Sequence, residues 1–205
     1  MTATMMRMTK TAEMMTEMAN RRGTLFVLSG PSGAGKGTLR EKTFESVKGI
    51  AYSISCTTRE PREGERDGVE YFFVTEEEFD RRIAAGDFLE WANVHGHKYG
   101  TLRPHVEEVL SSGSDMLLEI DVQGALQVKE KMPEAVTVFI APPSPEVLER
   151  RLRGRGTETE EQISVRLANA RKEMDLQKYY DLVIVNGDLD RAVAELSGFI
   201  EHYRQ

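Results

Sequence analysis

The stretch "LFVLSGPSGAGKGTL", residues 25–39, constrains the fold and chemistry of this chain more than any other segment. Gly30, Gly35 and Lys36 have the phosphate-loop spacing G-x-x-x-x-G-K. The apolar run 24–29 before the loop predicts a buried strand, and residues 36–46 after it predict a helix. Glycine lets backbone N–H groups turn toward a phosphate without a Cβ in the way, and the positive end of a helix attracts the same anion. We therefore expect this loop to hold nucleotide phosphates, with Lys36 at the β- and γ-phosphates.

The loop departs from the usual pattern at one position. The residue after the lysine is commonly Ser or Thr, but here it is Gly37, and the hydroxyl comes one place later, at Thr38. Thr38 is thus the candidate ligand for a Mg²⁺ ion bound with ATP, and direct ligation stays an open question. The loop residues that we expect to contact ATP are Gly30, Pro31, Ser32, Gly33, Ala34, Gly35, Lys36, Gly37 and Thr38.

From Gly23 onward, apolar strands alternate with helical segments. This alternation predicts an α/β fold with a parallel sheet covered by helices on both faces, which gives three layers. The polar stretch from about 53 to 102 interrupts the rhythm and predicts a small mixed α/β insertion. The expected strands are 24–29, 51–55, 69–74, 87–94, 115–121, 135–140 and 182–185, and the expected helices are 36–46, 76–85, 104–112, 123–131, one beginning near 145, one beginning after Thr159, and 189–203.

Composition excludes several classes of function. The formal net charge of −7 argues against general nucleic-acid binding, and the apolar runs are too short to cross a bilayer. The single cysteine, Cys56, allows no intrachain disulfide, which fits a reducing compartment such as the cytoplasm. Residues 1–22 contain seven of the ten methionines, and we expect them to form a disordered extension of the domain 23–205.

The polar stretch supplies candidates for a second site. Arg59 and Arg62 lie three residues apart, and paired arginines make forked, charge-assisted bonds to a phosphate. A carboxylate such as Glu90 accepts both donors on the N1 edge of guanine and repels adenine, which has an acceptor there. The arginines could instead be solvated loop charges. His95 and His97 resemble a metal pair, but no cysteine or acidic residue stands nearby at metal-ligand spacing.

Several segments together are typical of one family. They are "SGPSGAGKGTL", "SCTTREPREGERDGVEYFF", "FLEWANVHGHKYGT", "EIDVQG", "FIAPPS", "RLRGRGTETEEQISVRL" and "VIVNGDLD". From Gly23 to about Tyr203 the chain resembles the guanylate kinase family, whose members phosphorylate GMP, and commonly dGMP, with ATP and Mg²⁺. The resemblance implies a nucleotide core, a GMP-binding insertion and a mobile lid at about 146–172.

The resemblance also implies roles for individual residues. The GMP phosphate would be held by Arg59, Arg62, Tyr71 and Tyr99. The guanine would be read by Ser55, Glu90, Thr101 and Asp121. ATP would also meet Arg151 and Asn186, and the catalytic residues would be Lys36, Arg59, Arg155 and Arg166. Each has a plainer alternative: the tyrosines could be ordinary half-buried aromatics, and Asp121 could cap the end of a strand.

Two other functions stay open from the sequence. Some domains of this family have lost catalysis and bind protein ligands, such as phosphopeptides, although this chain keeps the loop lysine and the arginines. The second alternative is a kinase for another nucleotide, such as AMP. Glu90 and Asp121 argue against it. Family resemblance leads us to expect a bacterial cytoplasmic enzyme with ATP and GMP as its partners, and the oligomeric state stays undetermined.

Overall fold

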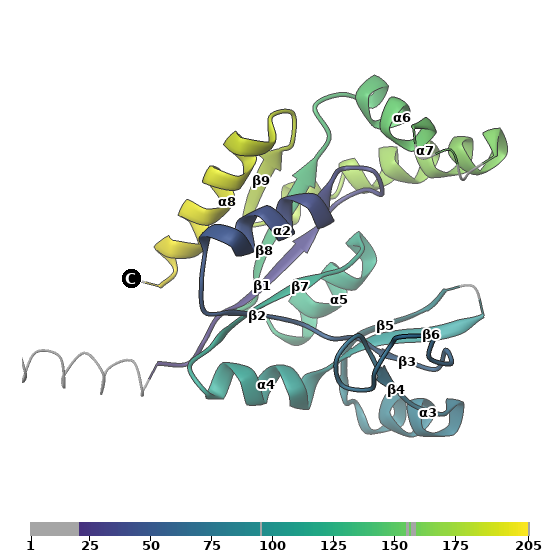
Figure 1. The fold of residues 1–205 in the computed structure, drawn as a ribbon, viewed down its shortest axis with the longest axis vertical. Helices are drawn as coiled ribbons and strands as arrows, with labels where there is room; N and C mark the ends of the chain where they lie inside the picture. Colours follow the sequence, from purple (N-terminus) through teal and green to yellow (C-terminus); the bar gives the residue numbers. More distant parts are fainter. Residues whose placement is uncertain (1–20, 95, 155, 157–158, 205) are drawn as a thin grey trace, which may run out of the picture.

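A five-stranded parallel sheet forms the centre of the protein in the computed structural model, which describes residues 21–94, 96–154, 156 and 159–204. Its strand order is β2-β7-β1-β8-β9, so β1 lies in the middle (Figure 1). Nearly every residue of β1, β7 and β8 is buried, because helices cover both faces of the sheet. The bounds are β1 Leu25–Ser29, β2 Ile50–Tyr52, β7 Asp115–Glu119, β8 Val136–Ala141 and β9 Leu182–Val185.

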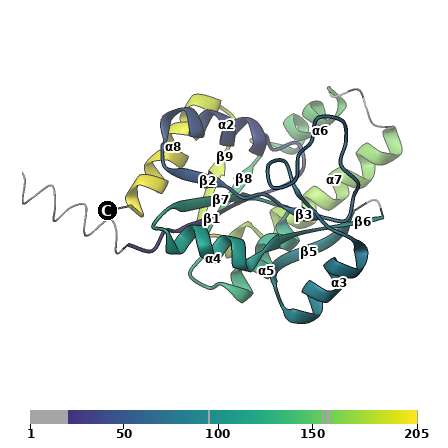
Figure 2. The same ribbon diagram turned by 60° about the horizontal axis from the view of Figure 1, so that its bottom comes forward.

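Helices pack on both faces of this sheet, as the alternating pattern predicted. On one face, α2 and α8 bury Leu39, Leu196 and Ile200 against Phe26 and neighbouring strand residues. On the other, α4 and α5 bury their apolar side chains against alternate residues of the same strands (Figure 2). The bounds are α2 Lys36–Ser46, α4 Arg103–Ser111, α5 Val122–Lys131, α6 Pro145–Arg153, α7 Glu160–Met174 and α8 Leu189–His202, with a short 3-10 helix, η1, at Gln177–Tyr179.

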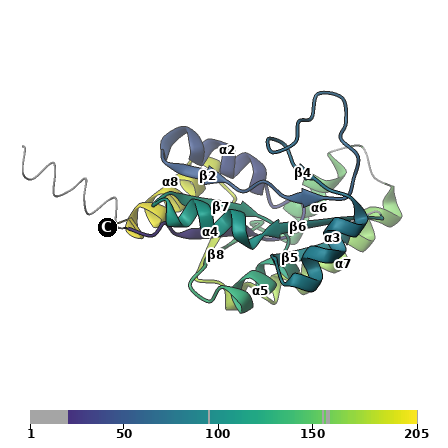
Figure 3. The ribbon, with the colours of Figure 1, turned by 90° about the horizontal axis from the view of Figure 1, so that it is seen from below.

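A second sheet of four strands, in the order β4-β3-β6-β5, lies beside the first together with helix α3 (Figure 3). Its strands pair in mixed directions: β3 runs parallel to β4, whereas β6 is antiparallel to both β3 and β5. Helix α3 ends at Gly86, whose φ of 75° suits glycine. The bounds are β3 Cys56–Thr57, β4 Phe72–Phe73, α3 Glu76–Ala85, β5 Phe88–Val94 and β6 His97–Leu102.

Some sequence expectations about strands were wrong. The predicted strand 51–55 ends early: β2 stops at Tyr52, and residues 53–55 belong to no strand before β3 begins at Cys56 in the other sheet. Strand β6 was not predicted, because its sequence, HKYGTL, is polar and contains glycine; pairing with β3 and β5 decides its conformation. The predicted strand 115–121 ends at Glu119, and Asp121 is instead the N-cap of α5.

The two ends of the described chain meet at one buried carboxylate. Asp115 is 2% exposed and accepts hydrogen bonds from Arg21, from the backbone N–H of Thr24 and from Arg204. Arg22 also forms an ion pair with Glu107. These contacts place residues 21 and 22 against the core, while the rest of the Met-rich segment, residues 1–20, lies outside the described residues.

Candidate functional site

The glycine loop lies between the end of β1 and the start of α2, as predicted. Gly30 has φ 138°, and a Cβ there would lie 2.2 Å from the carbonyl oxygen of Ile140. Gly35, the N-cap of α2, has φ 90°, and its Cβ would lie 2.5 Å from Asn186 Nδ2. Both positions therefore require glycine, because an added Cβ would meet strained backbone and a close neighbour at once.

Lys36 lies over this loop. Its Nζ donates hydrogen bonds to the carbonyl oxygens of Gly30, at 2.6 Å, and Pro31, at 3.2 Å. As the first residue of α2, it places its charge at the helix end where the backbone N–H groups are unpaired. A cation and unpaired N–H donors thus lie together at this helix end, which suits an oligophosphate.

Two of the predicted ATP contacts, Arg151 and Asn186, form hydrogen bonds that hold the loop. Arg151, on α6, donates to the carbonyl oxygens of Ala34 (3.2 Å) and Asn186 (2.8 Å). The buried side chain of Asn186 donates to the same Ala34 carbonyl at 2.8 Å. The structure therefore brings both residues to the phosphate loop, from segments that are about 120 and 150 residues away along the chain.

Helix α7 brings charged groups to the same loop. Arg166 NH1 donates to the Ser32 hydroxyl at 2.9 Å. Glu173, which sequence reasoning did not single out, lies near Lys36 and Asp121; burial raises the pKa of its carboxyl, although Lys36 opposes that shift. The predicted catalytic Arg155 lies outside the described residues.

The predicted phosphate contacts of the insertion cluster around Arg59. Its guanidinium lies 5.2 Å from the ring centre of Tyr71, and the rings of Tyr71 and Tyr99 meet edge to face at 6.1 Å. Glu65, which the sequence analysis missed, accepts a hydrogen bond from Arg59 NH2 at 2.9 Å and another from the backbone N–H of Arg62 at 2.8 Å. Glu65 therefore holds both arginine positions together, and its place three residues after Arg62 was the available signal.

Three of the four predicted guanine contacts, Glu90, Thr101 and Asp121, lie close together. Glu90 is 7% exposed, and its Oε1 accepts a hydrogen bond from the buried Thr101 hydroxyl at 2.6 Å. Asp121 accepts one from the backbone N–H of Gly124 at 2.7 Å, and a Cβ on Gly124 would lie 3.2 Å from Glu90 Oε2. The two carboxylates thus approach each other across Gly124. Ser55, half-buried, lies on the same insertion, where its carbonyl oxygen accepts from Phe72 N.

Burial makes the Glu90 carboxyl a weaker acid than an ordinary glutamate. Desolvation raises the pKa of its carboxyl to about 7; the nearby Asp121 also raises it, while Thr101 and Lys131 oppose the shift. Hydrogen-bond donors placed against this carboxyl would stabilise its ionised form and so lower its pKa.

Oxygen ligands suitable for Mg²⁺ stand beside the loop. Thr38 is exposed in the first turn of α2. Glu119 Oε1 lies 3.8 Å from where a Cβ on Gly37 would be, and Arg40 approaches its other oxygen at 3.4 Å. Oxygen donors fit a hard cation that keeps several waters and binds through the substrate's phosphates, so the residues present suit Mg²⁺. The described residues contain no group of three His, Cys, Asp or Glu side chains that could hold a metal ion by themselves.

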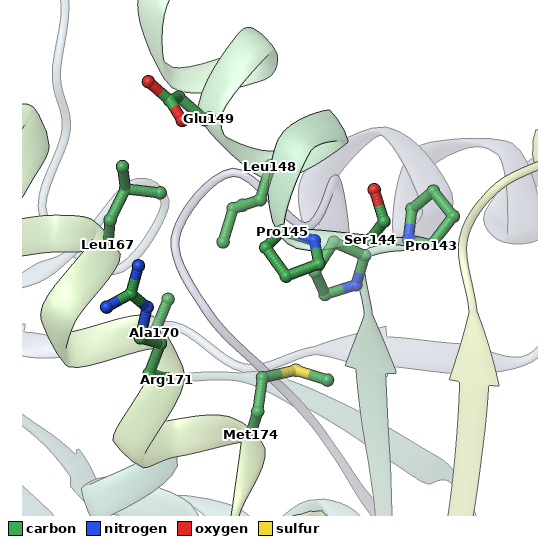
Figure 4. Close-up of a pocket in the computed structure, with 10 residues that line it drawn as sticks. Pro143, Ser144, Pro145, Leu148, Glu149, Leu167, Ala170, Arg171 and Met174 are labelled. Atoms are coloured by element: carbon green, nitrogen blue, oxygen red, sulfur yellow. The ribbon is translucent and has the colours of Figure 1, made fainter.

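An apolar pocket of about 200 Å³ lies between the start of α6 and the side of α7 (Figure 4). None of the predicted site residues lines it. It touches the nucleotide loop only indirectly: Leu148, in its wall, packs 2.9 Å from where a Cβ on Gly33 would be. Its lining is Pro142, Pro143, Ser144, Pro145, Leu148, Glu149, Leu167, Ala170, Arg171 and Met174.

Together, fold and site define the class of protein. A glycine loop follows the central strand of a parallel sheet, its lysine begins the next helix, and arginines from α6 and α7 reach the loop. This is the architecture of P-loop phosphotransferases.

Comparisons with known proteins give the family. The guanylate kinase family model matches residues 22–203. The guanylate kinase of Symbiobacterium thermophilum is 53% identical over 87% of this chain and 85% of its own length, and that of Fusobacterium nucleatum is 53% identical over 88% and 97%. A crystal structure of guanylate kinase from Anaplasma phagocytophilum superposes with a TM-score of 0.66 at 36% identity, covering 91% of this chain and 88% of that one. The chain belongs to the guanylate kinase family.

Proposed function

We propose that this protein transfers the γ-phosphoryl group of ATP to GMP, giving ADP and GDP. One observation carries the choice of GMP: a buried carboxylate, Glu90, is held by Thr101 and faces Asp121 beside a phosphotransferase loop. Guanine presents two donors along one edge and adenine does not, so a site built to accept them rejects adenine by roughly 10⁴ or more. No predicted contact reaches the sugar's 2′ position, so dGMP should also be a substrate.

The proposed reaction needs little proton chemistry. The second pKa of a phosphate monoester is ~6, so the GMP phosphate is largely ionised at neutral pH and can attack directly. One of its oxygens forms a bond to the γ-phosphorus of ATP, the bond from that phosphorus to the β–γ bridging oxygen breaks, and ADP leaves. Catalysis therefore depends on bringing two polyanions together and on stabilising the charge that develops.

The chain's own cations would divide this work. Lys36 and the N–H groups of the loop bind the β- and γ-phosphates, whereas Arg59 and Arg62 hold the acceptor phosphate with the tyrosine hydroxyls. Arg166 already contacts Ser32 of the loop, so a small movement of α7 would bring it to the transferring group, and we assign Arg155 the same task. Mg²⁺, when bound with ATP, neutralises phosphate charge; Thr38 and Glu119 are the residues that would hold it or its waters.

Water must be kept from the phosphoryl group, because it competes with GMP as acceptor. We propose that the segment 146–172, which includes most of α6 and α7, closes as a lid, and that the insertion 53–102 closes from the other side. In Figure 1 both lie on the side of the five-stranded sheet where β1 leads into the glycine loop. We also propose a cytoplasmic location, which the lone buried Cys56 favours. No helix among the described residues is long and apolar enough to span a membrane.

A substrate panel tests this function. Purified protein with ATP and Mg²⁺ would be assayed for ADP release with GMP, dGMP, AMP, CMP and UMP. We expect turnover with GMP and dGMP, kcat/KM values for the others lower by about 10⁴, and loss of turnover when EDTA removes the metal. Preference for AMP, or absence of any GMP phosphorylation, would overturn the proposal.

A further inference from the structure

Strand β5 contains an irregularity immediately before the guanine-reading carboxylate. Phe88 pairs with Leu102 of β6, but Glu90 pairs with Thr101, so two steps along β5 correspond to one step along β6. This two-to-one count is the signature of a β-bulge at Leu89. Bulges re-aim side chains, because the residue after the bulge faces the opposite side from the one it would face in a regular strand.

The side chains around the bulge show this change of face. In a regular strand Phe88 and Glu90 would point the same way, since side chains alternate. Instead Phe88 packs with Phe79 and Leu102 in the small core under α3, whereas Leu89 packs with residues of α4 and α5. Glu90 also faces α5, where its Oε2 lies by Gly124. Three successive residues, 88–90, are therefore buried, and Glu90 reaches Thr101 and Asp121 only because of the extra residue.

Helix α5 holds the bulge from outside the sheet. Lys131, in its last turn, donates from Nζ to the carbonyl oxygen of Phe88 at 2.9 Å. One turn earlier, the Gln127 amide faces both the N–H and the carbonyl of Trp91, at 3.4 and 3.5 Å, near the long limit for hydrogen bonds. The contacts of α5 with Phe88 and Trp91 thus bracket Glu90 on both sides, and the Lys131 bond is the shorter and charge-assisted one.

We propose that Lys131 is a positioning residue for guanine recognition: its bond to the Phe88 carbonyl keeps the bulge at Leu89, and the bulge turns Glu90 toward the guanine. Lys131 touches neither nucleotide in this account, so its effect reaches the substrate only through Glu90. The inference rests on the proposed GMP kinase function. It adds a residue that lies outside the phosphate loop, the arginine cluster and the proposed guanine site.

A matched pair of lysines on α5 provides the experiment. Lys129 also donates to a backbone carbonyl, that of Ala135, at 2.8 Å, and pairs with Asp181 at 3.1 Å, so it contacts the residues just before β8 and β9 rather than β5. Lys131→Met and Lys129→Met each remove one charge and one bond to a backbone carbonyl from the same helix. The Lys131 charge also lowers the pKa of Glu90, so KM for GMP is measured at pH 7 and again at pH 9, where the Glu90 carboxyl is largely ionised in each variant. A rise in KM that disappears at pH 9 would assign the effect to charge alone and overturn the inference. Folding of both would be verified from thermal melting, and KM for GMP, KM for ATP and kcat would be measured for each.

Lys131→Met should raise KM for GMP about tenfold and change kcat and KM for ATP less than twofold. The ratio of kcat/KM for GMP to that for AMP should fall about tenfold as well. Lys131→Arg should restore KM for GMP, and Gln127→Ala should raise it only two- to threefold, since its bonds are long. Lys129→Met should lower Tm without changing KM for GMP.

A folded Lys131→Met protein with wild-type KM for GMP would overturn the inference and leave the proposed function standing. Equal rises of KM for GMP in both lysine variants would also overturn it, since loss of helix stability would then explain the effect. Absence of GMP phosphorylation by the wild-type protein would instead overturn the proposed function itself.

Discussion

The phosphate loop and the proposed guanine site are built in opposite ways. The loop is nine consecutive residues, and two of its glycines admit no side chain: Gly30 faces the Ile140 carbonyl and Gly35 faces Asn186. The proposed guanine site is built of side chains from distant segments, with Glu90 and Thr101 on two strands and Asp121 at a helix start. Backbone N–H groups are the same in every residue, so the loop would recognise any oligophosphate, whereas the side chains of the proposed guanine site would select one base.

The largest effect should come from the loop's single strong charge. Lys36→Ala removes the cation expected at the β- and γ-phosphates and should lower kcat by roughly 10²–10³, because charge stabilisation is the main contribution to phosphoryl transfer. Steady-state kinetics with saturating ATP and GMP measures this. A variant that keeps near-normal phosphoryl transfer would contradict the role given to Lys36.

Arg59→Ala removes the cation that we propose holds the phosphate of GMP. It should also reduce turnover by orders of magnitude, but with a rise in KM for GMP rather than ATP. If Arg59→Ala changed KM for ATP and left GMP unaffected, the division of the site into a loop for ATP and an insertion for GMP would be wrong.

At Glu90, folding favours the protonated carboxyl, whereas guanine binding would need the ionised one. The pKa of Glu90 is raised from its ordinary 4.5 to about 7, so the folded protein binds this proton more tightly than the unfolded chain does. The stability contributed by the protonated form is therefore complete below pH 4.5 and is lost as the pH rises through 7, where the buried carboxylate costs about 3 kcal/mol.

Glu90→Gln should consequently raise the free energy of unfolding at pH 8 by up to about 3 kcal/mol and leave it nearly unchanged at pH 4. The same substitution should raise KM for GMP about 10²-fold. Urea unfolding at the two pH values and kinetics with GMP and AMP measure both effects. A Glu90→Gln protein that was less stable than wild type at pH 8 would show that the carboxylate is better compensated than its burial indicates.

Alanine substitutions at two glycines of the loop, Gly35 and Gly37, should change the stability of the protein in opposite directions. Gly35→Ala should destabilise the protein by roughly 2–3 kcal/mol, since φ is 90° and the new Cβ would lie 2.5 Å from Asn186 Nδ2. Gly37→Ala, one residue into α2, should be neutral or stabilising by about 0.5–1 kcal/mol, because the nearest atom is 3.8 Å away. Chemical denaturation of the two variants measures the difference. Equal losses would mean that the loop tolerates no Cβ anywhere, independent of its backbone angles.

The strands and helices of the core could be predicted from the sequence, and those of the insertion could not be predicted to the same extent. Buried strands such as β1 and β8 have continuous apolar sequences, and the helix predicted to begin after Thr159 is α7, where Thr159 and Gln162 form a capping box. Strand β6 is polar, and β4 is only two residues long, so pairing with neighbours decides their conformation.

For the site, the sequence by itself determined the phosphate loop and the kinds of residue around it. The loop binds through the backbone of consecutive residues, so its geometry follows from local glycine and helix preferences. The tertiary structure decided how Glu65 pairs with Arg59, that Asp121 caps a helix, and that Arg166 reaches Ser32. It also decided that a bulge turns Glu90 toward Asp121. These arrangements depend on which segments distant in sequence pack together, and no local preference specifies that packing.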